Sequence, residues 1–425
     1  MSLRRSFLAL VVLASSVAAC GSSSSLPTLN WYINPDNGGQ AELAKACTDA
    51  AGGRYQVKTS LLPSDATSQR EQLVRRLAAN DSSIDLMSLD PPFVAEFANA
   101  GFLHTFSDAD TAVFTDGVLK GPVASAMWNG KLVAAPFWAN TQLLWYRKSV
   151  AQKAGIDPSA NAVTWDQVIK AAEATGTTVE VQADRYEGYM VWINALVSSA
   201  GGTILKNPEA GKEVEPGINT DAGTQAATII RQLAGSKAAD PAISTSKEES
   251  GRAAFQSSRG GFMVNWAYIY GAAQEAVVGG SLAQAVLDDI SWARYPQVNG
   301  SASRPPLGGI DLAISSFSKH TDFAIEAAKC ITTAASEKAY MLKSKNPAAR
   351  GAVYDDADVR TTFPMADLIR ESIDAASPRP QTPYYTDVST ATVRTFHPPS
   401  SVDPNRTPGT TAKLIVDVLH DRVLL

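Results

Sequence analysis

The sequence predicts an α/β protein whose mainly parallel sheets are flanked by helices, and three observations lead to this prediction. Strand-like and helix-like segments alternate from residue 26 onwards, the order typical of a parallel sheet covered on both faces. One strand-like segment, SIDLMSLDP, is a buried run rather than an alternating one. The chain has 425 residues, 45% of them hydrophobic, which is enough for two or three domain-sized units.

The first twenty residues have the features of an export signal. Two arginines precede an apolar run from Phe7 to Leu13, which is too short to span a membrane. Val-Ala-Ala-Cys, ending at Cys20, resembles a bacterial lipobox. This resemblance implies that residues 1–19 are a cleaved signal peptide and that residues 20–26 are a lipidated tether. Lipid on Cys20 would hold the chain on the extracellular or periplasmic side of the cell membrane. A plain signal peptide with an incidental cysteine is the alternative.

Three strand–helix units are expected next. They pair strand 26–34 with helix 39–53, strand 54–63 with helix 64–81, and strand 83–91 with helix 93–103. Ser64 or Asp65 is the expected N-cap of the second helix. Further along, Thr164 is the expected cap of a helix that ends at Thr175. Later helices are expected over 189–202, 221–235, 322–335, 363–376 and 407–423, with a strand over 309–315.

Two cysteines remain in the exported part of the chain. Cys47 and Cys330 each lie on a predicted amphipathic helix. Disulfides persist outside the cytoplasm, so we expect a bridge that would close a very long loop. Two buried free thiols are the alternative, because cysteine also packs as a small hydrophobe.

Several kinds of chemistry lack their sequence signals. The net charge is −5 and no basic block stands out, which argues against a nucleic-acid partner. The four histidines are scattered, so we expect no metal and no cofactor. Nucleophile-elbow and phosphate-loop motifs do not occur. A glycosidase is not excluded, because its two carboxylates need no fixed local motif.

Aromatic and small polar residues recur where predicted strands and helices end. Examples are Asn34, Asp90, Asn140, Trp266 and the Tyr384–Tyr385 pair. In open α/β sheets, ligands bind at the carboxyl ends of strands. Sugars suit such residues, because their C–H faces stack on aromatic rings while carboxylates, amides and guanidinium groups hydrogen-bond their hydroxyls.

Seven segments, taken in order, resemble one known family. They are IDLMSLDPPFVAEFANAGF, NTQLLWYRK, NALVSSAGG, EESGRAAF, VNWAY, GGIDLAI and FPMADLIRES with RPQTPYY. Their order and spacing are similar to those of the sugar-binding lipoproteins of ABC importers. Within that family the likeness is greatest to the trehalose-binding lipoproteins of mycobacteria and other actinobacteria. The resemblance covers nearly the entire mature chain.

This resemblance implies a periplasmic-binding-protein fold with two lobes and a ligand cleft and hinge between them. We expect residues 27–139 and 304–345 in the N-terminal lobe, and residues 140–293 and 350–425 in the C-terminal lobe. The chain would cross between lobes near Ala139–Thr141, Ala293–Pro306 and Ser344–Arg350, so PFWANTQLLWYRKS from Pro136 would be one crossing.

The resemblance also implies individual roles in sugar binding. Asp90 is similar to the acidic residue that holds sugar hydroxyls, or it caps the next helix. Asn140 is similar to an amide donor, or it forms a turn. Glu248 matches an acidic ligand, although its neighbour Glu249 leaves the register open, and a solvated glutamate is the alternative. Trp266 is similar to a stacking platform, or it packs in the core.

Four further residues complete the expected set. Gly309 would let the backbone approach the ligand, or it serves the entry to a strand. Arg379 is similar to a guanidinium that reaches across the cleft, or it is a surface arginine. Asn34 and Gln69 occupy loops that often touch sugar in this family.

We therefore expect a monomeric binding protein, not an enzyme, that passes a sugar to the transmembrane subunits and ATPase of an ABC permease. Trehalose is the leading candidate among disaccharides. A secreted glycoside hydrolase and a binder of a non-sugar solute are the alternatives.

Overall fold

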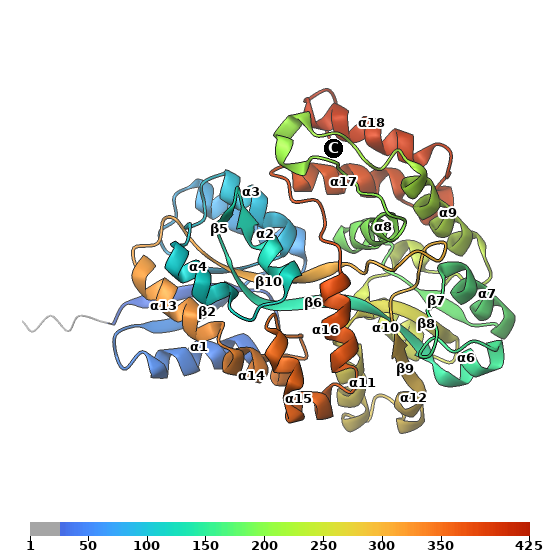
Figure 1. Cartoon of the computed structure of the whole chain (residues 1–425), viewed down its shortest axis with the longest axis horizontal. Coiled ribbons are helices and arrows are strands. Elements are labelled where there is room, and N and C mark those ends of the chain that lie inside the picture. Colours follow the sequence, from blue (N-terminus) through green and yellow to red (C-terminus); the bar gives the residue numbers. More distant parts are fainter. Residues whose placement is uncertain (1–25) are drawn as a thin grey trace, which may run out of the picture.

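Two lobes joined by one long strand make up the computed structural model, which describes residues 26–425. The predicted signal peptide and Cys20 lie outside the described residues. In Figure 1 the lobes stand side by side, and β6 (Ala135–Arg147) runs from one into the other. Among the described helices, none has the length and hydropathy needed to cross a bilayer.

The N-terminal lobe contains a sheet with the strand order β2-β1-β3-β10-β6. Strand β1 is parallel to β2 and β3, whereas β10 is antiparallel to β3 and β6. The strands are β1 (Thr28–Ile33), β2 (Gln56–Leu61), β3 (Leu86–Leu89) and β10 (Leu307–Ile314), with β4 (Met127–Trp128) and β5 (Lys131–Leu132) forming a separate hairpin. The helices are α1 (Gly39–Ala50), α2 (Ala66–Ala78), η1 (Pro91–Phe93), α3 (Val94–Asn99), α4 (Asp108–Thr115), α5 (Lys120–Ser125), α13 (Thr321–Ile331) and α14 (Ala334–Ser344).

The C-terminal lobe continues the sheet on the other half of β6. Strand β6 is antiparallel to β8 and β9, and β8 is parallel to β7. The strands are β7 (Thr178–Glu180), β8 (Gly260–Trp266) and β9 (Ile290–Ala293). The helices are α6 (Lys148–Ala154), α7 (Trp165–Thr175), α8 (Glu187–Ser199), η2 (Pro208–Glu213), α9 (Asp221–Gly235), η3 (Ile243–Thr245), α10 (Glu248–Gln256), α11 (Ile269–Val278), α12 (Gln284–Asp289), α17 (Tyr385–Phe396), η5 (Pro399–Ser401) and α18 (Thr407–Leu419).

Strand β6 changes partners at its middle. Up to Thr141 it pairs with β10, and from Gln142 it pairs with β8. Its side chains alternate between two hydrophobic cores beyond that point: Leu144 and Tyr146 belong to the larger core, Leu143 and Trp145 to the smaller one. Trp145 and Tyr146 are therefore packing residues, while the polar residues at the middle of the strand lie where the lobes meet.

Residues 350–376 differ from the expected division into lobes. We expected them in the C-terminal lobe, but η4 (Gly351–Asp355) and α15 (Ala357–Thr362) pack against α14, and α16 (Ala366–Ala375) packs against β6 and α5. Ile369 and Ile373 are fully buried in the smaller core, which contains residues of both lobes. This amphipathic segment therefore packs where the chain crosses between the lobes. Only the later helices α17 and α18 pack against α8 and α9 of the C-terminal lobe (Figure 1).

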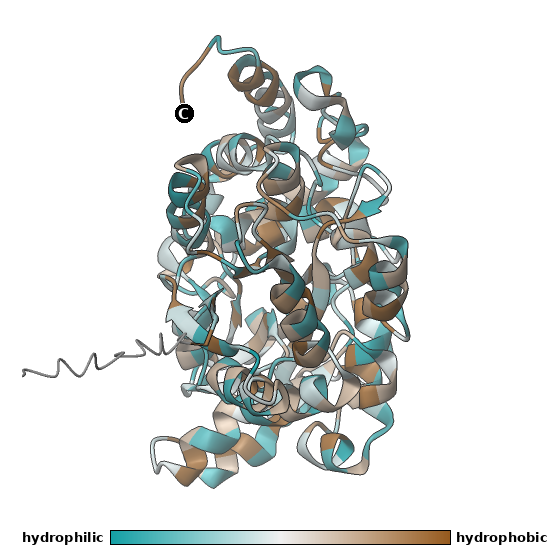
Figure 2. Ribbon diagram, turned by 90° about the vertical axis from the view of Figure 1, so that its left-hand side faces the viewer, coloured by the Kyte–Doolittle hydropathy of each residue, from teal (hydrophilic) through white to brown (hydrophobic). Residues whose placement is uncertain are grey.

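The two cysteines form a disulfide, with 2.06 Å between the sulfur atoms. Cys47 lies on α1 and Cys330 on α13, so the bridge joins the two separate chain segments that build the N-terminal lobe. Helix caps follow the sequence: Asp65 accepts a hydrogen bond from the Ser68 amide, and Thr164 forms a capping box with α7. Hydrophobic and hydrophilic residues share most helices, as Figure 2 shows, which is typical of helices with one face on a core.

Candidate ligand-binding cleft

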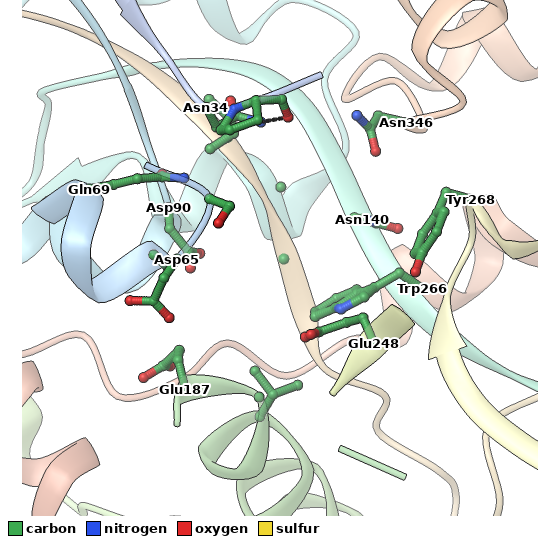
Figure 3. A pocket seen from close by; sticks show the side chains of 18 of the residues that line it. Asn34, Asp65, Gln69, Asp90, Asn140, Glu187, Glu248, Trp266, Tyr268 and Asn346 are labelled. Carbon is green, nitrogen blue, oxygen red and sulfur yellow. Dashed lines mark hydrogen bonds between the residues drawn. The ribbon is translucent and has the colours of Figure 1, made fainter. Parts of the chain in front are cut away.

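A cavity of about 500 Å³ lies between the lobes, where the carboxyl ends of β1 and β3 meet the middle of β6. All eight residues expected at a sugar site line it: Asn34, Gln69, Asp90, Asn140, Glu248, Trp266, Gly309 and Arg379. Figure 3 shows side chains from the N-terminal lobe on one side and Trp266, Glu248 and Glu187 on the other. Residues far apart in sequence therefore converge on one space.

Arg379 joins the two walls of this cavity. Its Nη2 lies 2.5 Å from Asp90 Oδ1, and its Nη1 lies 2.7 Å from Glu187 Oε1. Asp90 follows β3 in the N-terminal lobe, whereas Glu187 begins α8 in the C-terminal lobe. Burial alone would lower the pKa of the Arg379 guanidinium, but the carboxylates, Asp90 first, raise it, so the group stays charged.

Glu187 is the buried end of this arrangement. Ser389 Oγ donates to Glu187 Oε2 at 2.7 Å, and the Tyr385 hydroxyl donates to Oε1. Burial raises the pKa of Glu187, while Arg379 and these hydroxyls oppose the rise. Both oxygens of Glu187 therefore have protein partners, and the residue acts mainly by positioning Arg379.

Trp266 provides a flat apolar surface in the cavity. A Cβ at Gly308 would lie 2.8 Å from the Trp266 ring, so the indole rests directly on the glycine backbone. Gly309 has a different constraint: its φ is +128°, and a Cβ there would lie 2.3 Å from the Trp138 carbonyl oxygen on β6. Gly309 thus permits the close approach of β10 to β6 at a bulge, in addition to lining the cavity.

Asn140 is held in one orientation. Its Oδ1 accepts hydrogen bonds from the Thr141 amide at 2.9 Å and the Ala267 amide at 3.4 Å. The residue is only 6% exposed, and its Nδ2 donates to no group in the described part of the chain. The remaining group on this cavity-lining side chain is therefore a hydrogen-bond donor.

Gln69 and Asn34 each use an amide N–H within the protein and keep the side-chain oxygen as an acceptor for a ligand. The Gln69 Nε2 is bound to the Pro63 carbonyl at 2.8 Å, and the Asn34 Nδ2 donates to the Pro35 carbonyl at 3.4 Å. Asn34 Oδ1 is buried and has no partner within residues 26–425. Since a buried unpaired acceptor is costly, a ligand hydroxyl is a suitable partner for it.

Glu248 and Glu249 both line the cavity, but they differ in their hydrogen bonds. Glu249 is occupied: Arg252 Nη2 lies 2.6 Å from one oxygen and the Tyr268 hydroxyl 2.5 Å from the other. Burial acts to raise the pKa of Glu249, but these two donors lower it overall. Glu248 receives a single side-chain hydrogen bond, from Tyr186 to Oε2 at 2.7 Å, so its Oε1 is the carboxylate oxygen left for a ligand.

Several lining residues were missed by sequence reasoning. They are Asp65, Tyr186, Glu187, Tyr268 and Asn346. Trp138, whose position two residues before Asn140 in the sequence indicates a second ring at the cleft, also lines the cavity. Burial raises the pKa of the Tyr186 and Tyr268 hydroxyls, so both remain protonated donors. Tyr268 was within reach of prediction, because it follows Trp266 in the segment VNWAY. Glu187 had no local signal, since its role depends on a residue 192 positions away.

The cavity suits a polyhydroxylated ligand better than a metal. Within residues 26–425, no group of three or more His, Cys, Asp or Glu side chains could hold a metal ion. The walls instead offer an indole face, an amide donor, an amide acceptor and a carboxylate, which are the groups that bind sugar rings and hydroxyls.

A family model places the chain among known proteins. The model for bacterial extracellular solute-binding proteins matches residues 39–339, more than half of the 425-residue chain. The chain belongs to this family. A probable ABC transporter-binding protein from Deinococcus radiodurans is 26% identical to this solute-binding protein over 339 residues, which cover 77% of the chain and 76% of the relative.

Solved structures share its fold. A maltose-bound protein of T. maritima, MalE3, has a TM-score of 0.77 at 24% identity and covers 93% of this chain and 100% of its own. The GacH receptor of Streptomyces glaucescens, solved with acarbose, has a TM-score of 0.76 at 20% identity, covering 94% and 100%. UgpB from Mycobacterium tuberculosis, in complex with glycerophosphocholine, has a TM-score of 0.75 at 17% identity, covering 94% and 99%. The solute-binding protein thus has the two-lobed fold expected from its sequence.

Proposed function

We propose that this protein captures a disaccharide in the cleft and delivers it to an ABC permease, with trehalose as the leading candidate. The observation that carries the proposal is the cavity itself, in which Trp266 faces hydrogen-bonding groups from both lobes. Its volume of about 500 Å³ lies within the range typical of small-molecule sites. A sugar would stack on the indole and exchange hydroxyl hydrogen bonds with Asn34, Asn140 and Glu248.

A ligand that contacts both lobes favours the arrangement in which those lobes are close together. The bridging contacts exist only in that arrangement, so sugar shifts the population toward it. We propose that the closed, monomeric form docks on the transmembrane subunits of the importer, whose ATPase supplies the energy. Lipid on Cys20 would keep the protein at the outer face of the cell membrane, close to the permease.

The relatives support this proposal by what is known of them. The relative in Deinococcus radiodurans is a probable ABC transporter-binding protein, and two of the fold neighbours were solved with maltose and with acarbose. The structure with glycerophosphocholine shows that this fold also serves solutes that are not sugars. The lining residues of this chain are therefore the stronger argument for a sugar.

Calorimetry with trehalose, maltose and sucrose tests the proposal. We expect at least one disaccharide to bind, and Trp266→Ala to weaken that binding by about 100-fold or more, because the stacking surface is lost. Trp292 is a matched control, since it is half-buried outside the cavity and packs on Trp145. Trp292→Ala should leave affinity unchanged. The absence of binding by every sugar would count decisively against the proposal.

The glycoside hydrolase alternative is tested with the same sugars. A hydrolase needs one carboxyl group as acid and a second as base or nucleophile, and it turns its substrate over. Prolonged incubation of the protein with each disaccharide should leave the sugar intact. Release of glucose or fructose, lost in the Glu248→Gln variant, would replace the binding function by catalysis.

A further inference from the structure

Three helices begin at the wall of the cleft, and each carries its own carboxylate at that end. Asp65 is the N-cap of α2, Glu187 is the first residue of α8, and Glu248 is the first residue of α10. All three residues line the cavity. The N-terminus of a helix is ordinarily a favourable place for an anionic ligand, because its amides and its dipole present positive charge. Here the protein has filled each of these positions with its own negative charge.

The other charged side chains at the cavity also disfavour an anionic ligand. Its lining includes five carboxylates, those of Asp65, Asp90, Glu187, Glu248 and Glu249. Arg379 is the one cation among the described lining residues, and both of its terminal nitrogens are bound to Asp90 and Glu187. The cations behind the lining are also engaged, Arg252 with Glu249 and Lys247 with Asp184. Among the described residues that line the cavity, no cation other than Arg379 is present to neutralise an anionic ligand.

We propose, building on the proposed function, that this cleft selects its solute by charge. It accepts neutral and amine-bearing sugars and excludes phosphorylated and carboxylated ones. Glu248 is the main discriminating residue, because one of its oxygens has no hydrogen-bond donor in the described chain and faces the cavity beside Trp266 (Figure 3). Asp65 contributes in the same way, since only its Oδ1 is used, by the Ser68 amide.

An amine would find a favourable position beside Glu248. The Tyr186 hydroxyl bonds to that carboxylate and Trp266 lies beside it (Figure 3), and aromatic faces attract ammonium groups. Tyr186 already has the ammonium of Lys247 4.9 Å from its ring centroid. A phosphate at the same place would instead meet like charge in a partly buried site, where repulsion is screened less than on an open surface.

The fold by itself does not impose this selection. The fold neighbour from Mycobacterium tuberculosis was solved with glycerophosphocholine, which contains a phosphodiester. Exclusion of anions in this chain therefore depends on its own carboxylates, and it should change when they are neutralised.

The test compares four forms of one sugar by calorimetry: trehalose, trehalose 6-phosphate, 6-amino-6-deoxytrehalose and 6-O-acetyltrehalose. If another disaccharide binds in place of trehalose, its corresponding derivatives are used. We expect the phosphate to bind about 100-fold more weakly than the parent sugar and the amine at least as tightly as the parent. The acetyl ester adds bulk without charge and measures how much of the loss is steric.

Isosteric variants separate charge from shape. Glu248→Gln and Asp65→Asn preserve the shape of the side chain and remove its charge, although one carboxylate oxygen becomes an amide donor. Each variant should reduce the ratio of the dissociation constants of the phosphate and the parent sugar by about tenfold. Glu275→Gln is the matched control, because Glu275 is exposed on α11 outside the cavity and the variant changes the net charge equally. It should leave the ratio unchanged. Raising the salt concentration should narrow the ratio in the wild type only modestly, because the site is partly buried.

Three results would overturn the inference. The first is a dissociation constant of the phosphate within about threefold of that of the parent sugar, and the second is an amine that binds more weakly than the phosphate. The third is an acetyl ester that loses as much affinity as the phosphate, together with a phosphate-to-parent ratio that Glu248→Gln does not alter. If no parent sugar binds at all, the proposed function itself fails and the inference falls with it. The parent titration thus tells the two failures apart.

Discussion

The guanidinium of Arg379 holds both carboxylate oxygens of Asp90, with Nη2–Oδ1 at 2.5 Å and Nη1–Oδ2 at 3.3 Å. The same Nη1 reaches Glu187, so one side chain connects a strand end of the first lobe to a helix start of the second. The Arg379 side chain is 3% exposed. This contact is therefore a buried ionic link between lobes as well as a part of the cleft wall.

Arg379→Met should destabilise the protein more than Asp90→Asn. The first change leaves Glu187 buried without a cation, which costs about 3–5 kcal/mol. The second leaves Arg379 paired with Glu187 and should cost about 1–2 kcal/mol. Chemical denaturation of both variants measures the difference.

A double variant serves as the control for this prediction. Arg379→Met with Glu187→Gln removes the unpaired charge and should recover part of the lost stability. Equal stability of the two single variants, or no recovery of stability in the double variant, would contradict the prediction.

Gly308→Ala and Gly309→Ala should act on different properties. A Cβ at position 308 would press on the Trp266 ring, whose edge can move, so affinity should fall about tenfold or more with a stability loss of about 1 kcal/mol. A Cβ at position 309 would meet backbone atoms at a φ of +128°, so the expected stability loss is about 3 kcal/mol or more. Thermal unfolding and sugar titration distinguish them. The prediction is wrong if Gly309→Ala retains wild-type stability.

Removing the disulfide should lower stability without lowering affinity. The Cys47→Ala/Cys330→Ala variant frees a link between residues 283 positions apart, and we expect a loss of about 2–4 kcal/mol. Neither cysteine lines the cavity, so sugar should bind the folded variant as tightly as the wild type. Urea unfolding of the wild type with and without reductant provides the comparison. A variant as stable as the oxidised wild type would contradict the prediction.

Glu180 should make stability depend on pH. Burial, partly opposed by the Thr178 hydrogen bond, raises the pKa of Glu180 to about 7 from an ordinary value of 4.5. The folded state then binds the proton more tightly than the unfolded state, so this contribution is complete below about pH 4.5 and is lost as the pH rises through about 7. The loss should amount to about 3 kcal/mol at most.

Glu180→Gln should remove this pH dependence. Urea midpoints measured at pH 5 and pH 8 should differ less in the variant than in the wild type, and the variant should be the more stable protein at pH 8. Glu275→Gln, on the exposed side of α11, is the control and should follow the wild type. An unchanged midpoint difference in Glu180→Gln would exclude Glu180 as the source.

Much of the fold could be predicted because its signals are local. The capping residues Asp65 and Thr164 mark the starts of α2 and α7, and a continuous apolar run marks β3. The position of α16 could not be predicted in this way. Its amphipathic pattern indicates that one face of the helix is buried. The pattern does not indicate whether that face packs against β6 or against the C-terminal helices.

The site shows the same limit more sharply. Segment order and resemblance were enough to choose eight residues that the structure brings to one cavity. They could not distinguish Glu248 from Glu249, because the difference depends on the hydrogen bond from Tyr268 to Glu249, and Tyr268 lies just after the end of β8. Nor could they find Glu187, whose partners Arg379, Tyr385 and Ser389 come from a different part of the chain.

Strand β6 belongs to both lobes, so the alternation of its side chains runs without a break from one lobe into the other. Beyond Gln142 its successive side chains enter different cores, Leu144 one and Trp145 the other. A residue inserted near position 141 would exchange these two sets, since the period of a strand is two. Chimeras that combine lobes from two members of the family must therefore keep this strand in phase, and the irregular link between β9 and β10 is the better place for an insertion.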